Sequence, residues 1–390
     1  MNSKLFSKLK IRDVTAPNRI VLSPLCMYSA KEGVPNEWHF SHLSTYARAR
    51  VGIIFTEATA VQEIGRITPY CCGIWNDKQA EAYSKISSFI KKMGSIPAIQ
   101  LAHAGRKGSA EQPWKGGSPI KFTKGNEENQ LRSWKTIAPS PIPLGEGWQK
   151  PEAISLEEIE KLIADYVNAA KRSIEAGFEI IEIHAAHGYL LHSFLSPISN
   201  KRTDEYGRNF NGRIKLLKKV IEEIRNNIPS KTPIFCRISA IDGLENGWTI
   251  EDSVKLAEIL KNVGIDVIDC SSGGIIGRPR FAVNDHGDQL NKNTDRGLGF
   301  QVPLADEIKK KVNISTMAVG VIINAVQAEK ILIAGQADLI AMGRELMYNP
   351  FWPLHAAQEL NVDPKYQMWP DQYRWAVNRR ASIEKFKKIS

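Results

Sequence analysis

Eight short runs rich in isoleucine and valine recur along this chain, and a helical pattern follows each of them. Most runs lack clean alternation of polar and apolar residues, which is typical of strands covered on both faces in a parallel sheet. The runs cover residues 19–25, 51–58, 96–103, 178–184, 233–239, 265–272, 314–320 and 337–343. Eight such units are the number that closes a (β/α)8 barrel, so the sequence predicts an α/β fold with one TIM barrel.

The alternative fold is an open doubly wound sheet. The sequence supports it less well, because no GxGxxG motif follows the first run. The clearest helix is predicted over residues 155–176. Ser155 and Glu158 match a capping box there, and Gly177 suits the left-handed position that ends a helix. Further helices are predicted at about 38–50, 77–93, 212–227, 249–264, 302–311, 324–334 and 344–360.

Two long loops are predicted to leave the barrel. Residues 104–153, rich in glycine, proline and tryptophan, follow the third strand, and residues 273–300 follow the sixth. Both would project from the C-terminal mouth, where barrels place their active sites. Nothing in the sequence indicates a second domain, so we expect one domain over residues 1–390 with a C-terminal extension at about 361–390.

Composition narrows the class of protein. The net charge is +10, but the basic residues are scattered in short runs on predicted helices, which favours solvated faces over a nucleic-acid site. The five cysteines form no CxxC pair, which argues against disulfides and a metal cluster. The N-terminus has no apolar signal core, and no apolar run approaches the ~20 residues that span a membrane. We therefore expect a soluble, cytoplasmic protein without nucleic-acid or membrane partners.

The last two strands end in glycines that indicate an anion site. Barrels often bind phosphate with the loops after strands seven and eight. Gly320 and Gly343 let backbone N–H groups approach an anion, and Arg344 follows at the start of a predicted helix. The alternative interpretation is that both glycines only make tight turns between strand and helix.

Two polar residues interrupt apolar strands. Arg237 lies within "PIFCRIS" and Gln100 within "IPAIQLAH". A buried arginine needs a partner, so Arg237 is either in a structural ion pair or beside a ligand that gains negative charge. With Gln100, it is suited to hold the edge of a polar heterocycle. Cys26 and Tyr28 follow the first strand, where the cysteine is either a small buried apolar residue or a site residue.

The stretch "IEIHAAHGYL" places His184, His187 and Tyr189 where the fourth strand ends. The histidines are three residues apart, so they converge only if the strand stops near His184, and Gly188 permits a sharp turn. A metal site, two structural histidines, or a pair of N–H donors to a substrate oxygen remain open. In the last case Tyr189 is the proton donor. The chain contains no HExxH motif that would complete a set of metal ligands.

These junctions together resemble the Old Yellow Enzyme family of FMN-dependent ene-reductases. The matching stretches are "NRIVLSPLCMYSA", "IQLAHAGRKGS", "IEIHAAHGYLLHSFLSPISNKRTDEYG", "CSSGG", "MGREL" and "NPFWP". The chain is most similar to the bacterial branch with a cysteine after strand one, which includes xenobiotic reductases. The resemblance implies FMN at the mouth of a (β/α)8 barrel.

The resemblance also implies a role for each junction residue. The flavin would be lined by Ser23, Pro24, Leu25, Cys26, Ala58 and Gln100. Arg237 would face the N1/O2 edge of the ring, and the phosphate would bind at Gly320, Gly343 and Arg344. The substrate would contact His184, His187, Tyr28 and Cys26. Arg374 would reach a neighbouring subunit's site in a homodimer or homotetramer.

The implied activity is that of an NADPH dehydrogenase or ene-reductase, with NADPH or NADH as reductant. An enone or related electrophilic alkene would take hydride from flavin N5 at Cβ and a proton from Tyr189 at Cα. Two alternatives are a non-redox barrel acting on a phosphorylated substrate and a flavin-binding protein without turnover. In the loop 207–213 the chain departs from the family, with Arg208 for a glycine and Gly212 for an asparagine.

Overall fold

The computed structural model describes residues 3–120, 133–276 and 297–381. Its centre is a closed barrel of eight parallel strands in the order β3-β4-β5-β8-β9-β10-β11-β12. The strands are β3 (Ile20–Leu22), β4 (Ile53–Ala60), β5 (Ile96–Ala102), β8 (Ile180–Ala185), β9 (Ile234–Ser239), β10 (Val267–Ser271), β11 (Ser315–Ala318) and β12 (Leu339–Met342). Each overlaps one of the eight predicted runs, and only β4 and β8 extend past the end of theirs, which confirms the predicted TIM barrel.

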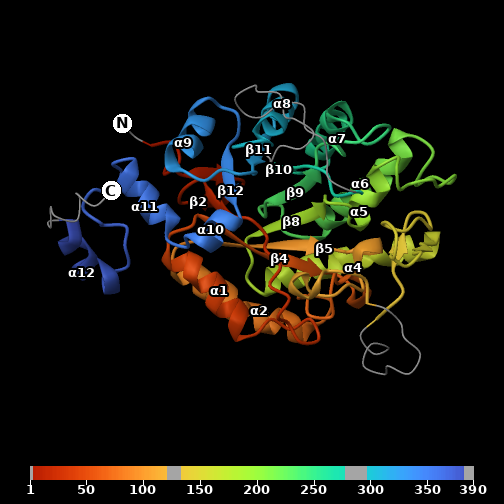
Figure 1. Ribbon diagram of the computed structural model, residues 1–390, viewed down its shortest axis with the longest axis horizontal. Helices are drawn as coiled ribbons and strands as arrows, with labels where there is room; N and C mark the ends of the chain where they lie inside the picture. Colours follow the sequence, from red (N-terminus) through yellow and green to blue (C-terminus); the bar gives the residue numbers. More distant parts are fainter. Residues whose placement is uncertain (1–2, 121–132, 277–296, 382–390) are drawn as a thin grey trace.

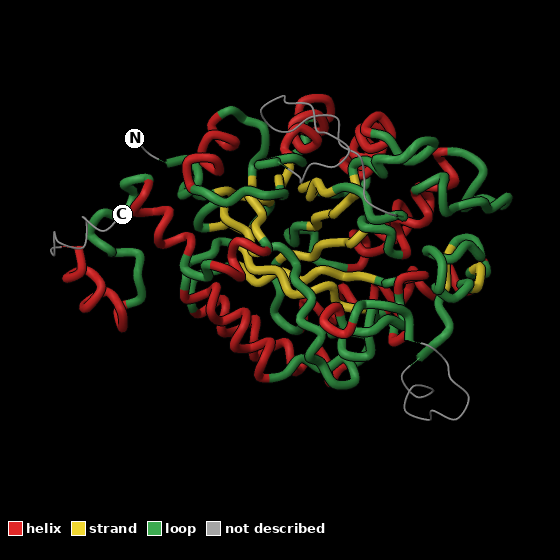
Figure 2. The backbone as a smooth tube through the Cα atoms, in the orientation of Figure 1, coloured by secondary structure: helices red, strands yellow, loops and turns green. Residues whose placement is uncertain are grey.

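Helices surround the strands (Figures 1 and 2). They are α1 (Glu37–Arg48), α2 (Asp77–Lys92), α4 (Leu156–Glu175), α6 (Phe210–Asn227), α7 (Ile250–Asn262), α8 (Val302–Val312), α9 (Ala325–Ile333), α10 (Arg344–Tyr348) and α11 (Trp352–Glu359). The capping box of α4 forms as predicted, with Ser155 and Glu158 each bonding the other's main-chain N–H. No helix within the described ranges is long and apolar enough to cross a bilayer.

The expectation of one helix over 344–360 is wrong. The chain leaves α10 after Tyr348 and begins α11 only at Trp352. The interruption contains Asn349 and Pro350, and proline disfavours helical geometry in the residue before it. The sequence also did not indicate α5 (Leu190–Leu195) or α12 (Asp371–Ala381), which lies beside α11 and away from the barrel in Figure 1.

The two ends of the barrel are closed differently. A hairpin of β1 (Leu9–Ile11) and β2 (Val14–Ala16) packs Ile11 and Ala16 against apolar residues from the start of the strands. These interior residues are Val21, Ile53, Phe55, Ala98, Ile180, Phe235, Val267, Met317 and Leu339. The N-terminal end of the barrel is therefore filled by packed side chains, and the opposite end is free to form a site.

The predicted long loops are partly described. The first contains η2 (Gly105–Lys107), η3 (Pro113–Lys115) and a parallel pair of short strands, β6 (Ile137–Ala138) and β7 (Glu152–Ala153). Most of the predicted loop 273–300 lies outside the described residues.

Candidate active site

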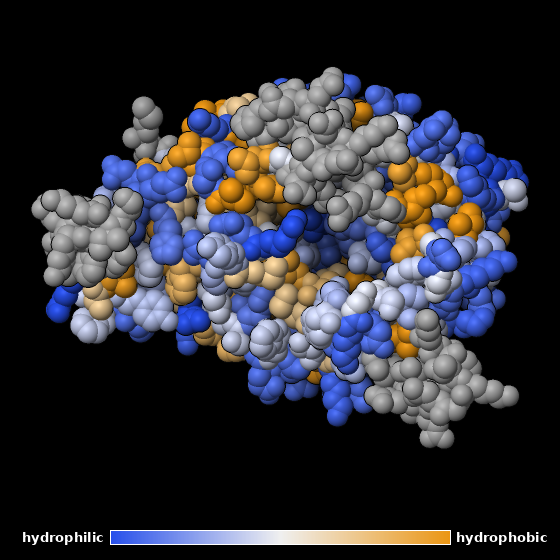
Figure 3. All heavy atoms as spheres, viewed as in Figure 1, coloured by the Kyte–Doolittle hydropathy of each residue, from blue (hydrophilic) through white to orange (hydrophobic). Residues whose placement is uncertain are grey.

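A cavity of about 530 Å³ opens at the C-terminal end of the barrel. Its volume is within the roughly 300–1,000 Å³ range of ligand pockets. In Figure 3 this face is hollowed near its middle, where hydrophilic and hydrophobic side chains meet. The predicted site residues that line the cavity are Ser23, Pro24, Leu25, Cys26, Ala58, Gln100, His184, His187, Tyr189, Arg237, Gly320, Gly343 and Arg344.

Loops after β11 and β12 form one part of the cavity wall. Gly320 has φ +123°, and a Cβ there would lie 2.9 Å from Cε1 of Phe300, so only glycine fits. Gly343 approaches Leu25, since its Cβ would lie 3.1 Å from Cδ2. Arg344 begins α10, which is only five residues long. An anion here would therefore depend on the guanidinium and nearby N–H groups more than on a helix dipole.

Arg237 forms the ion pair that its sequence context allowed, and its place beside a ligand stays a prediction. Its Nε pairs with Asp269 across 3.0 Å, and its Nη1 donates to Oγ of Ser23 across 3.0 Å. It also lines the cavity. The ion pair keeps a cation in the cavity wall, because a buried guanidinium without an anion would be far costlier.

Glu182 is a second buried acid beside this pair, and it was not among the predicted site residues. Burial raises the pKa of Glu182 well above its usual range; the charge of Asp269 raises it further, and Arg237 only partly opposes this. Glu182 is therefore the acid that keeps its proton, and Asp269 is the partner of Arg237. The carboxyl oxygen Oε1 of Glu182 accepts a hydrogen bond from Nε2 of Gln100 across 2.8 Å. This bond fixes the amide and leaves its carbonyl Oε1 as an acceptor.

The two histidines meet as the sequence predicted. β8 ends at Ala185, His187 and Gly188 turn with φ +60° and +75°, and the ring centres of His184 and His187 lie 5.2 Å apart. Burial lowers the pKa of both rings well below the usual value, and the charge of Arg237 adds to the effect. Both imidazoles are neutral, so each has one N–H to donate.

Their hydrogen bonds differ. Nε2 of His187 lies 2.6 Å from Oγ of Ser271. A second acceptor near Ser271 is Oε1 of Gln301, which lies 3.5 Å from the Ser271 hydroxyl. This oxygen also accepts a hydrogen bond from the hydroxyl of Ser272 across 2.6 Å. We assign Ser271 as the donor to Nε2 of His187, the nearer of the two acceptors, and this assignment places the ring proton on Nδ1. His184 is buried, and its ring nitrogen Nδ1 has no hydrogen-bond partner among the described residues.

Tyr189 completes the group. Its ring centre lies 5.2 Å from that of His184. Burial raises the pKa of Tyr189, and the nearby thiols of Cys26 and Cys71 raise it further, so the phenol holds its proton. A neutral phenol next to two neutral imidazoles provides donors without a fixed charge.

Cys26 lines the cavity, but Tyr28 is not among the lining residues. Burial raises the pKa of the Cys26 thiol well above its usual value, and Glu57 adds to this, while a hydrogen bond from Tyr28 opposes it. Tyr28 has φ +49°, and its ring packs edge-on against Trp114 at 5.9 Å. The structure thus joins Tyr28 to the site through Cys26.

Lys107 is a site residue that the sequence reasoning missed. Its Nζ donates to the main-chain oxygens of His187 (2.7 Å) and Gly274 (3.3 Å), and it lies 5.0 Å from the ring centre of Tyr189. Burial lowers its pKa to about 8, and the charge of Arg106 contributes. The available signal was a lysine directly after the third strand, inside "AHAGRKG".

Two predicted features do not reach the cavity. Arg374 lies on α12, where it pairs with Asp371 across 2.7 Å, and it is not among the lining residues. Its contact with a neighbouring subunit stays a prediction. The atypical loop 207–213 also contributes no lining residue. A Cβ on Gly212 would lie 1.9 Å from the main-chain oxygen of Gly207, so the loop requires glycine at this position.

The fold and cavity place the chain among barrel enzymes that bind small molecules at the carboxyl ends of their strands. Over residues 4–363 it matches the family described as NADH:flavin oxidoreductase / NADH oxidase. It is 41% identical to an NADPH dehydrogenase of Bacillus cytotoxicus across 99% of this chain and 100% of that protein. An NADPH dehydrogenase of Listeria innocua serovar 6a is also 41% identical, across 92% and 95% of the two chains.

Solved structures share the fold. An Old Yellow Enzyme homologue from Zymomonas mobilis aligns with a TM-score of 0.72 and 26% identity, covering 93% of each chain. Morphinone reductase in complex with tetrahydroNAD aligns with a TM-score of 0.71 and 23% identity, covering 92% of this chain and 91% of that one. The chain therefore belongs to the NADH:flavin oxidoreductase family, the Old Yellow Enzyme family that its motifs resemble. It is an NAD(P)H-dependent flavin oxidoreductase.

Proposed function

We propose that this protein is an FMN-dependent ene-reductase that uses NADPH or NADH to reduce the C=C bond of α,β-unsaturated carbonyl compounds. The observation that carries the proposal is the buried Nδ1 of His184, which has no hydrogen-bond partner in the part of the chain that the structure describes. Buried polar groups nearly always have hydrogen-bond partners, so exceptions need an explanation. A carbonyl oxygen of a bound substrate supplies the missing partner.

The residues around the cavity fit FMN. The Oε1 atom of Gln100 suits an N–H of the flavin ring, and Arg237 suits the ring edge that becomes negative on reduction. Gly320, Gly343 and Arg344 suit the phosphate. Bound FMN would supply the redox chemistry, taking two electrons from the nicotinamide and delivering hydride to Cβ of the alkene.

The histidine pair would hold and polarise the substrate. Nδ1–H of His187 and an N–H of His184 would donate to the carbonyl oxygen, which draws electron density from Cβ. Because both rings stay neutral, they stabilise the developing enolate by hydrogen bonding without protonating it. The same donors are suited to the carboxamide oxygen of the nicotinamide, so the two substrates would bind in turn.

Tyr189 would protonate Cα. Its phenol holds its proton beside the histidine pair, and the Lys107 ammonium group stabilises the phenolate that remains. A non-redox reaction on a phosphorylated substrate would leave the Gln100–Arg237 edge without a role. A flavin-binding protein without turnover would not need Tyr189 next to the histidines.

The test is anaerobic titration of FMN-loaded protein. The protein should be yellow, lose its oxidised-flavin absorption with NADPH, and regain it with cyclohexenone while forming one cyclohexanone per flavin. A protein that cannot be loaded with FMN, or a reduced protein that cyclohexenone does not reoxidise, would contradict the proposal. NADPH oxidation without cyclohexanone formation would also count against it.

A further inference from the structure

The turn that carries His187 and Tyr189 is fixed through its main chain. Between these residues lies Gly188, whose added Cβ would lie only 2.2 Å from the main-chain oxygen of Gly274. The N–H of His187 donates to Oγ of Ser239 across 2.9 Å. The N–H of Gly188 donates to a side chain rather than to the main chain. Its acceptor is Nδ1 of His192, 2.7 Å away.

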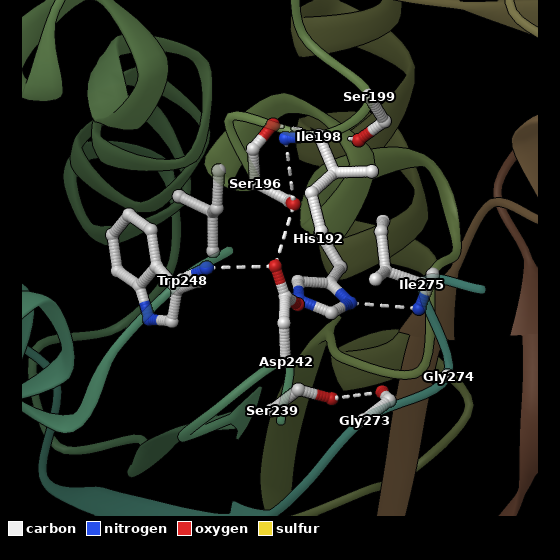
Figure 4. A network of polar contacts seen from close by, with 12 residues as sticks. His192, Ser196, Ile198, Ser199, Ser239, Asp242, Trp248, Gly273, Gly274 and Ile275 are labelled. Atoms are coloured by element: carbon white, nitrogen blue, oxygen red, sulfur yellow. Dashed lines mark hydrogen bonds and ion pairs between the residues drawn. The ribbon is translucent and has the colours of Figure 1, made fainter. Parts of the chain in front are cut away.

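His192, on α5, pairs in turn with Asp242, which follows β9 (Figure 4). Nε2 of His192 lies 3.0 Å from Oδ1 of Asp242, and neither side chain is exposed to solvent. The other carboxylate oxygen, Oδ2, accepts hydrogen bonds from the hydroxyl of Ser196 at 2.6 Å and from the main-chain N–H of Trp248 at 2.7 Å. Neither His192 nor Asp242 lines the cavity.

These contacts determine which ring nitrogen of His192 carries the proton. Because Nδ1 accepts the Gly188 N–H, it carries no proton, so the single ring proton is on Nε2, the nitrogen that lies 3.0 Å from Oδ1 of Asp242. A carboxylate accepts only, and it therefore selects this tautomer. The opposite tautomer would bring the Nδ1–H of His192 against the Gly188 N–H.

We propose that Asp242 and His192 are positioning residues, which hold His187 and Tyr189 in register by selecting the tautomer that binds the Gly188 amide. The proposal rests on the proposed function, because the geometry that it protects is that of substrate binding and proton donation. A change in this amide moves both side chains together. Misplacement of a reacting group by about 1 Å can slow catalysis about 10²-fold.

Asp242→Asn is the sharpest test, because it nearly preserves the shape of the side chain. The obligatory N–H of Trp248 requires the amide oxygen at the Oδ2 position, so the amide NH₂ faces His192. Nε2 of His192 must then accept, the ring proton moves to Nδ1, and it opposes the Gly188 N–H. The same change of acid to amide imposes the wrong histidine tautomer in serine proteases.

Three further variants separate positioning from stability. His192→Asn can keep an acceptor, its Oδ1, near the Gly188 N–H, whereas His192→Leu removes it. Ser199→Ala deletes a neighbouring buried hydrogen bond, from Ser199 Oγ to the main-chain oxygen of Ser193 at 2.7 Å, and leaves the pair intact. FMN content and melting temperature are measured for all four variants.

Stopped-flow kinetics then follow cyclohexenone reoxidation of the reduced enzymes. We expect Asp242→Asn and His192→Leu to be slowed about 10²-fold. His192→Asn should stay within a few-fold of wild type, and Ser199→Ala should match it. Nitrogen NMR of labelled histidine should find the proton on Nε2 in wild type and on Nδ1 in Asp242→Asn. A variant with the reversed tautomer and a wild-type reoxidation rate would overturn the proposal.

Failure of the proposed function has a different signature, which is wild-type reduced enzyme that cyclohexenone does not reoxidise. Hydrogen exchange at Gly188 decides the positioning claim in that case as well. Faster exchange in Asp242→Asn than in Ser199→Ala supports it, and equal exchange in both overturns it.

Discussion

Nζ of Lys107 donates a hydrogen bond to the main-chain oxygen of His187 across 2.7 Å. This bond ties the loop after β5 to the turn after β8, although the two residues are 80 positions apart. The same ammonium group lies 5.0 Å from the ring centre of Tyr189. Lys107 therefore contacts the two residues to which we assign carbonyl binding and proton donation.

Loss of the Lys107 charge should slow enone reduction. Burial lowers the pKa of Lys107 to about 8, so its positive charge is lost as pH rises through 8. We expect enone-dependent reoxidation by wild type to decline above that pH. Lys107→Met should be slow at every pH and should not show this decline. The pH profiles of both proteins, measured by stopped flow, check this; a wild-type profile that stays flat to pH 10 would contradict it.

The same shift predicts how stability changes with pH. The pKa of Lys107 is lower in the folded protein than the ~10.4 of a free lysine, so burying the cation destabilises the fold below pH 8. Between about pH 8 and 10.4 the unfolded chain binds more protons, and the free energy of unfolding rises with pH. The gain should reach about 3 kcal/mol relative to Lys107→Met. Denaturant unfolding of both proteins across this range measures it.

Ser271→Ala should weaken substrate binding. The hydroxyl of Ser271 lies 2.6 Å from Nε2 of His187, and with the donor role assigned to the hydroxyl it keeps the ring proton on Nδ1. Without it, both tautomers become accessible. We expect the Kd of cyclohexanone for the oxidised enzyme to rise roughly 2- to 12-fold, because a hydrogen bond contributes about 0.5–1.5 kcal/mol. FMN affinity serves as the control and should not change.

Removing Arg237 should separate stability from flavin binding. Arg237→Met leaves Asp269 as a buried, uncompensated anion, which should destabilise the fold by about 3–5 kcal/mol. Adding Asp269→Asn removes the uncompensated charge and should recover most of this loss. Flavin affinity, measured by fluorescence titration, should remain low in the double variant. Recovery of both properties together would argue that Arg237 serves only the ion pair.

Gly188→Ala tests the close approach of the turn to the neighbouring loop. The backbone of residue 188 has φ +75°, and the new Cβ would lie 2.2 Å from the main-chain oxygen of Gly274. Gly335→Ala is a matched control, since Gly335 has φ +70° but no atom within 4 Å of its Cβ. The control should lose only the roughly 1–2 kcal/mol of left-handed strain and keep its kinetics. Gly188→Ala should be less stable still and slower with cyclohexenone.

Much of this site could be predicted from sequence, because strands of a parallel barrel all end at the same mouth. Arg237, Gln100 and the histidines follow from reading strand ends alone, once eight strands are recognised. The contacts of Lys107, Glu182 and Asp242 could not be found in this way. Their roles depend on contacts between segments far apart in the chain, which no local pattern reveals.

Local structure was missed for physical reasons too. All six residues of α5 are buried, so it has no amphipathic pattern to recognise. The apolar period over 344–360 continued across Pro350, although this proline disfavours helical geometry at Asn349 and separates α10 from α11. The contact of Tyr28 with substrate stays a prediction, and in the structure Tyr28 lies beside the thiol of Cys26.

The most direct test of the account is the two half-reactions of Tyr189→Phe, measured anaerobically by stopped flow. Flavin reduction by NADPH needs no proton from this residue and should proceed at close to the wild-type rate. Reoxidation by cyclohexenone should slow by about 10²–10⁴-fold, the usual loss for one acid–base group. Equal slowing of both half-reactions, or wild-type reoxidation without the phenol, would contradict the assignment of Tyr189 as the proton donor.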